Sequence, residues 1–110
     1  MATTATDHVY RDESLSTPLA GRRGTLRRAE SDLIAAFGEP VDPGYSDGKV
    51  TKSWRFSTPR GAVDIRDYWW NGHGEWSLSS VDSKAIIWLR QFVKASIPGA
   101  QFQFRKRHFA

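Results

Sequence analysis

Cysteine is absent from the chain of 110 residues. This absence excludes disulfide bonds, thiol catalysis and cysteine-based zinc sites. The sequence has no run near the roughly 18 consecutive apolar residues that a membrane-spanning helix needs. Residues 1–8 lack the basic segment and apolar stretch of a secretory signal. We therefore expect one small soluble domain that needs no cofactor, does not interact with a membrane and is compatible with a cytoplasmic setting.

Motifs that would indicate catalysis are also missing. The chain contains neither an HExxH pattern nor a GxSxG elbow, and Gly21-Arg-Arg-Gly24 lacks the Lys-Ser/Thr pair of a phosphate loop. Asp64 and Asp67 are three apart on a predicted strand, so they point to opposite faces and cannot share a proton or a metal. Asp67 could meet Glu75 or His73 across a turn and hold a hard cation, but turn formation and cross-strand pairing are more ordinary roles. The sequence thus predicts neither an enzyme nor a metal site.

Aromatic residues and positive charge are abundant instead. Five Trp, three Tyr and six Phe make up 13% of the residues, and the formal charge is +4. Residues 1–48 carry eight acids and five bases, whereas residues 49–110 carry four acids and eleven bases. The second half could attract a polyanion or an acidic protein surface, although a plain solvated surface explains the charge equally well.

Hydrophobic periodicity predicts one folded domain over residues 22–110, after a flexible N-terminal arm over residues 1–21 that has a short strand near His8-Val9-Tyr10. Apolar residues at helical spacing predict two helices, Thr25–Phe37 and Asp82–Ile97.

One detail argues against an ideal first helix. Arg27 and Arg28 would lie in its first turn, where the helix dipole disfavours cations.

Alternating residues between short turns predict an antiparallel meander of three to five strands, with the two helices packed on it. The fold class is therefore α+β. The predicted strands are 49–57, 62–70, 75–80 and 101–104. The predicted core contains Trp54, Phe56, Ile65, Trp76, Leu78, Leu89 and Phe92.

The most distinctive segment is Asp67-Tyr-Trp-Trp-Asn-Gly-His-Gly-Glu-Trp76. Alternation turns Trp69 and Trp70 to opposite faces, so one ring should lie outside the core unless both faces are covered. Aromatic rings beside arginine suit a protein hot spot or base stacking. Cover by the N-terminal arm, or a homodimer through the double-Trp face, remains an alternative. The predicted partner-binding residues are Arg55, Arg66, Tyr68, Trp70 and His73.

The chain ends on a basic segment, Arg105-Lys106-Arg107-His108. Arg105, Lys106 and Arg107 could contact phosphates and give salt-dependent binding to nucleic acid. Such ends are also common solvating tails, and no known nucleic-acid-binding signature accompanies this one.

Four segments in the middle of the chain form one pattern of residues. They are Phe37-Gly-Glu-Pro40, Asp47-Gly-Lys-Val-Thr-Lys-Ser-Trp54, Val63-Asp-Ile-Arg-Asp-Tyr68 and Glu75-Trp76. In these residues the chain resembles a loose group of small phage and prophage accessory proteins with an FGEP…DGK…W…DY…EW pattern. The likeness covers about residues 33–80, and the sequence departs from the pattern at Arg66 and at the double Trp.

The resemblance implies a phage-borne accessory protein in the cytoplasm of a bacterial host. Small phage proteins without catalytic residues often bind and block a host enzyme or defence system, anti-CRISPR proteins among them. By this analogy we expect a non-enzymatic inhibitor of a host protein or protein–nucleic acid complex, such as a nuclease-type defence system. Direct nucleic-acid binding by an aromatic and basic sheet face is the alternative.

Overall fold

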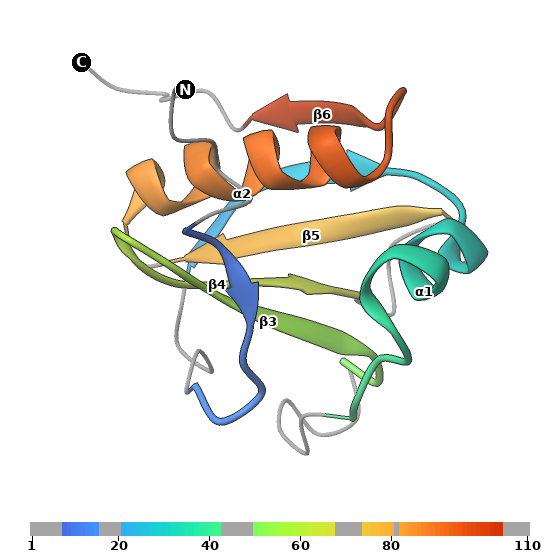
Figure 1. Cartoon of the computed structure of the whole chain (residues 1–110), viewed down its shortest axis with the longest axis horizontal. Helices are drawn as coiled ribbons and strands as arrows, with labels where there is room; N and C mark the ends of the chain where they lie inside the picture. The colour runs from blue at the N-terminus through green and yellow to red at the C-terminus, as the bar shows by residue number, and fades with distance from the viewer. Residues whose placement is uncertain (1–7, 16–20, 43–49, 68–73, 81, 105–110) are drawn as a thin grey trace.

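The computed structural model describes residues 8–15, 21–42, 50–67, 74–80 and 82–104 (Figure 1). These residues form six strands and two helices. In chain order the elements are β1 (Tyr10–Arg11), β2 (Gly21–Arg27), α1 (Glu30–Phe37), β3 (Ser53–Thr58), β4 (Gly61–Arg66), β5 (Glu75–Ser80), α2 (Ser83–Ser96) and β6 (Gln101–Phe104).

All six strands belong to one antiparallel sheet, in the order β1-β3-β4-β5-β2-β6. The predicted α+β class is confirmed. The predicted strand number is wrong, since the sheet has six strands rather than three to five. The sheet as a whole does not follow chain order either, because β2 lies between β5 and β6.

The first predicted helix is correct only in its second half. Residues 21–27 form strand β2, which pairs with β5 on one side and with β6 on the other. Leu26, predicted on the helical stripe, is fully buried opposite Trp76 and Phe102. Two neighbouring strands satisfy the backbone of this segment, and such tertiary pairing overrides a weak local preference for helix. Helix α1 begins only after Ala29, whose backbone is extended and whose side chain makes no cap.

The second predicted helix and the strand before it are confirmed. Helix α2 begins after Asp82, whose carboxylate accepts a hydrogen bond from the backbone N–H of Lys84. That bond satisfies one of the amides left without a partner at a helix start. The helix ends at Ile97, directly before Pro98. Strand β5 has the predicted bounds.

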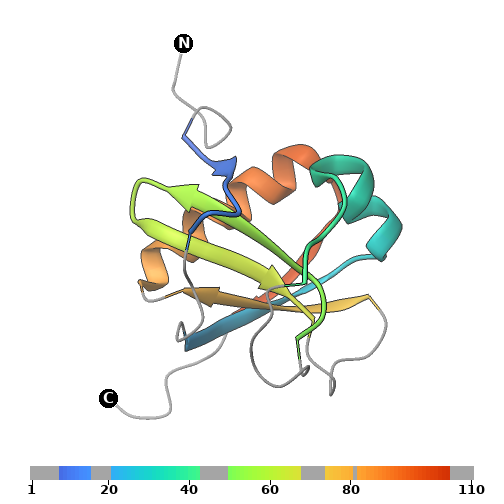
Figure 2. The same ribbon diagram turned by 90° about the horizontal axis from the view of Figure 1, so that it is seen from below.

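Both helices pack on one face of the sheet (Figure 1). The sheet is strongly twisted, and Figure 2 shows the β3–β4 hairpin running at an angle to β2 and β5. Phe37 of α1 contacts Phe56 of β3 edge to face and stacks on Phe92 of α2, with ring centroids 5.2 and 5.6 Å apart. Of the seven predicted core residues, all but Phe92 are buried, and Phe92 is half-buried against the same cluster. Neither helix in the described part of the chain has the length and hydrophobicity that a membrane crossing requires.

Residues 8–15 of the predicted arm pack on the domain. Val9 is 3% exposed and belongs to the core, and β1 pairs with β3 through Tyr10 and Arg11. Val41 forms a separate bridge with Ser53. The outer edge of β3 is therefore covered by two short pieces of chain, which protects it from pairing with another molecule. Residues 1–7 and 16–20 of the predicted arm lie outside the described residues, and Gly21, its last residue, begins β2.

Candidate binding surface

The sheet face opposite the helices is lined with polar side chains. Strict alternation along three central strands directs apolar residues to the helices and polar residues to the other face. The register aligns these polar residues in two rows across the sheet. One row is Ser53, Arg66 and Ser77; the other is Arg55, Asp64 and Ser79. We call these six residues the polar layer.

Arg66 is buried in the polar layer, which corrects its predicted place on an exposed face. Its side chain is 1% exposed, and that of Asp64 is fully buried. Arg66 Nε donates to Asp64 Oδ1 over 2.8 Å, and Nη2 donates to Oδ2. The two residues are two apart on β4, so their side chains share one face and form a two-point ion pair. A buried pair of this kind is a costly element of the fold rather than an open contact for a partner.

Arg55 is also held within the molecule. Its Nη1 donates to the carbonyl oxygens of Leu15 and Glu13, over 2.6 and 3.3 Å. Its backbone N–H donates to the Glu13 carboxylate over 3.0 Å. The half-buried Arg55 therefore ties residues 13–15 to β3.

The structure thus brings Arg55 and Arg66 onto one sheet face, but not as an exposed pair. Tyr68, Trp70 and His73 lie outside the described residues, and their role stays a prediction. The same holds for Arg105, Lys106 and Arg107.

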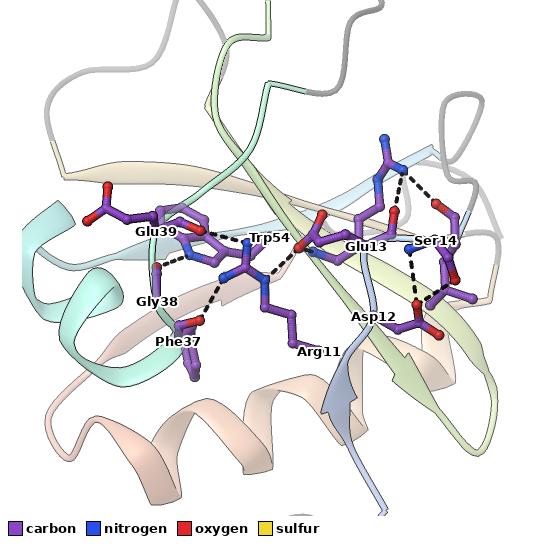
Figure 3. A network of polar contacts seen from close by, with 10 residues as sticks. Arg11, Asp12, Glu13, Ser14, Phe37, Gly38, Glu39 and Trp54 are labelled. Carbon is purple, nitrogen blue, oxygen red and sulfur yellow. Dashed lines mark hydrogen bonds and ion pairs between the residues drawn. The ribbon is translucent and has the colours of Figure 1, made fainter.

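Arg11 forms a second polar centre, on the side of β1 that faces α1. Its guanidinium donates to the carbonyl oxygens of Phe37 and Glu39 and to the Glu13 carboxylate, each over 2.7 Å (Figure 3). The first two acceptors lie at the C-terminal end of α1, where carbonyls lack helical partners and the helix dipole attracts a cation. Sequence reasoning missed Arg11, because nothing in the local pattern brings residue 11 to residues 37–39.

Residues that carry the phage-group pattern hold the fold together. Trp54 Nε1 donates to the carbonyl of Gly38 over 2.8 Å, and the Trp54 and Trp76 rings meet edge to face at 5.2 Å. Trp76 Nε1 donates to the carbonyl of Arg28 over 2.9 Å. Asp67 accepts from the backbone N–H groups of residues 51 and 52, over 2.9 and 2.8 Å. The described part of the pattern therefore has structural roles, and does not by itself mark a partner surface.

Six cations in the described part of the chain have a carboxylate partner. The six ion pairs are Arg11–Glu13, Arg27–Glu75, Arg28–Asp32, Lys52–Glu30, Arg60–Asp82 and Arg66–Asp64. The hydrogen bond that Lys52 Nζ donates to the Glu30 carboxylate raises the pKa of Lys52 above its ordinary value. The backbone hydrogen bond from Lys84, with help from Arg60, lowers the pKa of Asp82.

The exposed side of α2 is the exception. Residues 83–96 include Lys84, Arg90 and Lys94 but no acidic residue. Lys84 and Lys94 are exposed, and neither pairs with any carboxylate in the described residues. Between them Ile87 is 51% exposed and, with Tyr10 and Val41, is one of the exposed large apolar side chains of the described residues.

These positions form one stripe on the helix. Residues 84, 87, 91 and 94 follow the three- and four-residue spacing that places side chains on one helix face. We call Lys84, Ile87, Gln91 and Lys94 the α2 outer face. Trp88 borders it and is half-buried, with His8 against its ring edge at a centroid distance of 5.7 Å. The lysines of this face are visible in the sequence of the predicted helix, but solvated lysines on a helix are common. Only the exposure of Ile87 in the structure distinguishes this face from an ordinary solvated one.

No group of three or more His, Asp or Glu side chains with metal-binding geometry occurs in the described residues. No family model, curated protein or solved structure matches the chain. The α2 outer face is the candidate surface that the described residues define best.

Proposed function

We propose that the protein is a non-enzymatic binding protein of the phage type, which inhibits a host macromolecule by steric blocking. A nuclease-type defence system, as for anti-CRISPR proteins, is the class of target that the phage-group resemblance favours. The contact surface in this proposal is the α2 outer face rather than the sheet face of Arg55 and Arg66.

One observation carries the proposal. Lys84 and Lys94 lack carboxylate partners among the described residues, and they flank an exposed Ile87. An apolar centre with a charged rim is the usual composition of a protein–protein contact. The six ion pairs of the described residues support it indirectly, because their charges are already engaged within the chain.

The test compares three forms of the full chain as bait in a bacterial lysate. The wild-type chain and the variants Ile87→Glu and Ala35→Glu are immobilised, and captured proteins are identified by mass spectrometry. Ala35 is an exposed position on α1, so Ala35→Glu is matched in charge and in helical context. A true target is captured by wild type and by Ala35→Glu but lost from Ile87→Glu.

Blocking is then measured directly on the captured target. Wild-type protein at a one-to-one ratio should suppress the target's activity, and Ile87→Glu should leave it intact. Equal capture by all three baits, or capture without loss of activity, would contradict the proposal.

The alternative function, nucleic-acid binding, is tested by titrating the protein with single- and double-stranded DNA at two salt concentrations. Affinity that falls steeply with salt would favour the alternative function. Absence of binding to either DNA leaves a protein target.

A further inference from the structure

We infer that the occupant of the α2 outer face is an acidic amphipathic helix of a protein partner. The inference rests on the proposed function, whose surface it shares, and adds the chemistry and shape of the ligand.

Charge is the first argument. Outside α2, six described cations are neutralised by side-chain carboxylates within the chain. Lys84 and Lys94 form no ion pair with a carboxylate of the described residues, and no acid lies on the helix between them. Asp82, two residues before Lys84, pairs with Arg60 and attracts Lys84 only at longer range. Electrostatic potentials of opposite sign on two protein surfaces favour their association, and potentials of like sign disfavour it. A ligand with carboxylates at both ends of the face would therefore supply the ion pairs that the described residues do not give Lys84 and Lys94.

Shape is the second argument. The face is a single ridge from residue 84 to residue 94, which at 1.5 Å per residue is about 15 Å long. Ridges of this kind pack into the grooves between side-chain rows of another helix. Three turns of a partner helix would match its length. An apolar residue of that helix would meet Ile87, and glutamates or aspartates would meet Lys84 and Lys94.

The apolar centre of the α2 outer face favours a protein ligand over nucleic acid. Ile87 lies one turn after Lys84 and two turns before Lys94, so a bound phosphate backbone would pass over an apolar side chain that offers it no hydrogen bond. Two lysines would also release few counterions, with a salt slope of only about −2. A protein helix uses both the apolar centre and the charged ends.

The test uses three defined probes against the isotope-labelled full chain, followed by amide chemical shifts. Two are synthetic helical peptides of about 20 residues with the same apolar stripe, one flanked by glutamates and the other by lysines. The third is a duplex DNA. We expect the glutamate peptide to shift amides of residues 84–94 and to bind at least about tenfold more tightly than the lysine peptide. The double variant Lys84→Glu/Lys94→Glu should reverse that preference, and Ala35→Glu should keep it.

Several results would overturn the inference. These are equal binding of the two peptides, preference for DNA, shifts located away from α2, and no shift at glutamate-peptide concentrations up to about 1 mM. Thermal midpoints of the variants establish that each one is folded. If a target is captured through α2 but the two peptides bind alike, the proposed function stands and this inference fails. A glutamate preference without any captured target would support the ligand chemistry and count against inhibition.

Discussion

Arg66 and Asp64, two residues apart on β4, form an ion pair in which neither side chain is more than 1% exposed. The opposite side of the same strand carries Val63 and Ile65, both fully buried in the core under the helices. Strand β4 is therefore enclosed on both faces, one apolar and one charged. Removing one charge from such a site leaves the other without compensation in a poorly solvated place.

Arg66→Met should lower the free energy of unfolding by about 3–5 kcal/mol, because Asp64 then stays buried without its cation. The matched control is Arg27→Met, which breaks a pair in which Arg27 is 66% exposed. An exposed pair contributes about 1 kcal/mol at most. Urea unfolding of both variants measures the difference, and similar losses would show that burial does not set the effect.

Two substitutions of Trp54 should lower the free energy of unfolding by different amounts. Trp54→Ala removes a fully buried ring and should cost about 3–5 kcal/mol as a core cavity. Trp54→Phe keeps a ring against Trp76 but leaves the Gly38 carbonyl without its donor, and should cost about 1–3 kcal/mol. Trp88→Ala, at a half-buried position, is the control with the smallest expected loss. Denaturant midpoints rank the three, and a loss for Trp54→Phe as large as for Trp54→Ala would contradict the ranking.

Arg11 is expected to hold the end of α1. Arg11→Ala removes three donated hydrogen bonds and should destabilise the protein by about 1–3 kcal/mol. Arg11→Lys should recover only part of that loss, since an ammonium cannot reproduce the planar fork of the guanidinium. Hydrogen exchange at the α1 amides should quicken in Arg11→Ala more than exchange in α2. Uniform acceleration in both helices would instead indicate a global effect.

The loss of folding stability at acid pH should depend on Asp82. Because its pKa is lowered in the folded state, its ionisation contributes stability above its ordinary pKa of about 3.8, and that contribution is lost as pH falls through the lowered value. Asp82→Asn keeps an N-cap oxygen but cannot ionise, so it should flatten this part of the profile. Thermal midpoints between pH 2 and pH 6 measure the effect. An unchanged loss of stability at acid pH in Asp82→Asn would assign the dependence to other carboxylates.

Local patterns predicted the elements whose ends are marked in the chain. Asp82 and Pro98 bracket α2, and Gly38, with a positive φ of 87°, ends α1 where the sequence predicts. For residues 25–27 the same reasoning was wrong. Apolar spacing there fits a helix, but pairing with β5 and β6, which lie about 50 and 75 residues further along, makes it a strand.

The candidate site was less predictable for a related physical reason. The structure places the predicted contact residues Arg55 and Arg66 on one face of the sheet. A polar sheet face is ordinarily a solvated one. Whether such a face is buried depends on residues far away in the sequence, and a local pattern carries no information about them. Ile87 posed the opposite problem, because an apolar residue in an amphipathic helix is expected to be inside.

The charged side of β4 also bears on how the chain finds its native pairing. If β4 slipped by one residue against its neighbours, every side chain would change faces. Asp64 and Arg66 would then enter the layer of Trp54 and Leu78, while Val63 and Ile65 would take their places among serines. Burying these two charges among apolar side chains is costly, so the ion pair disfavours the shifted register and helps to specify the alignment of the central strands.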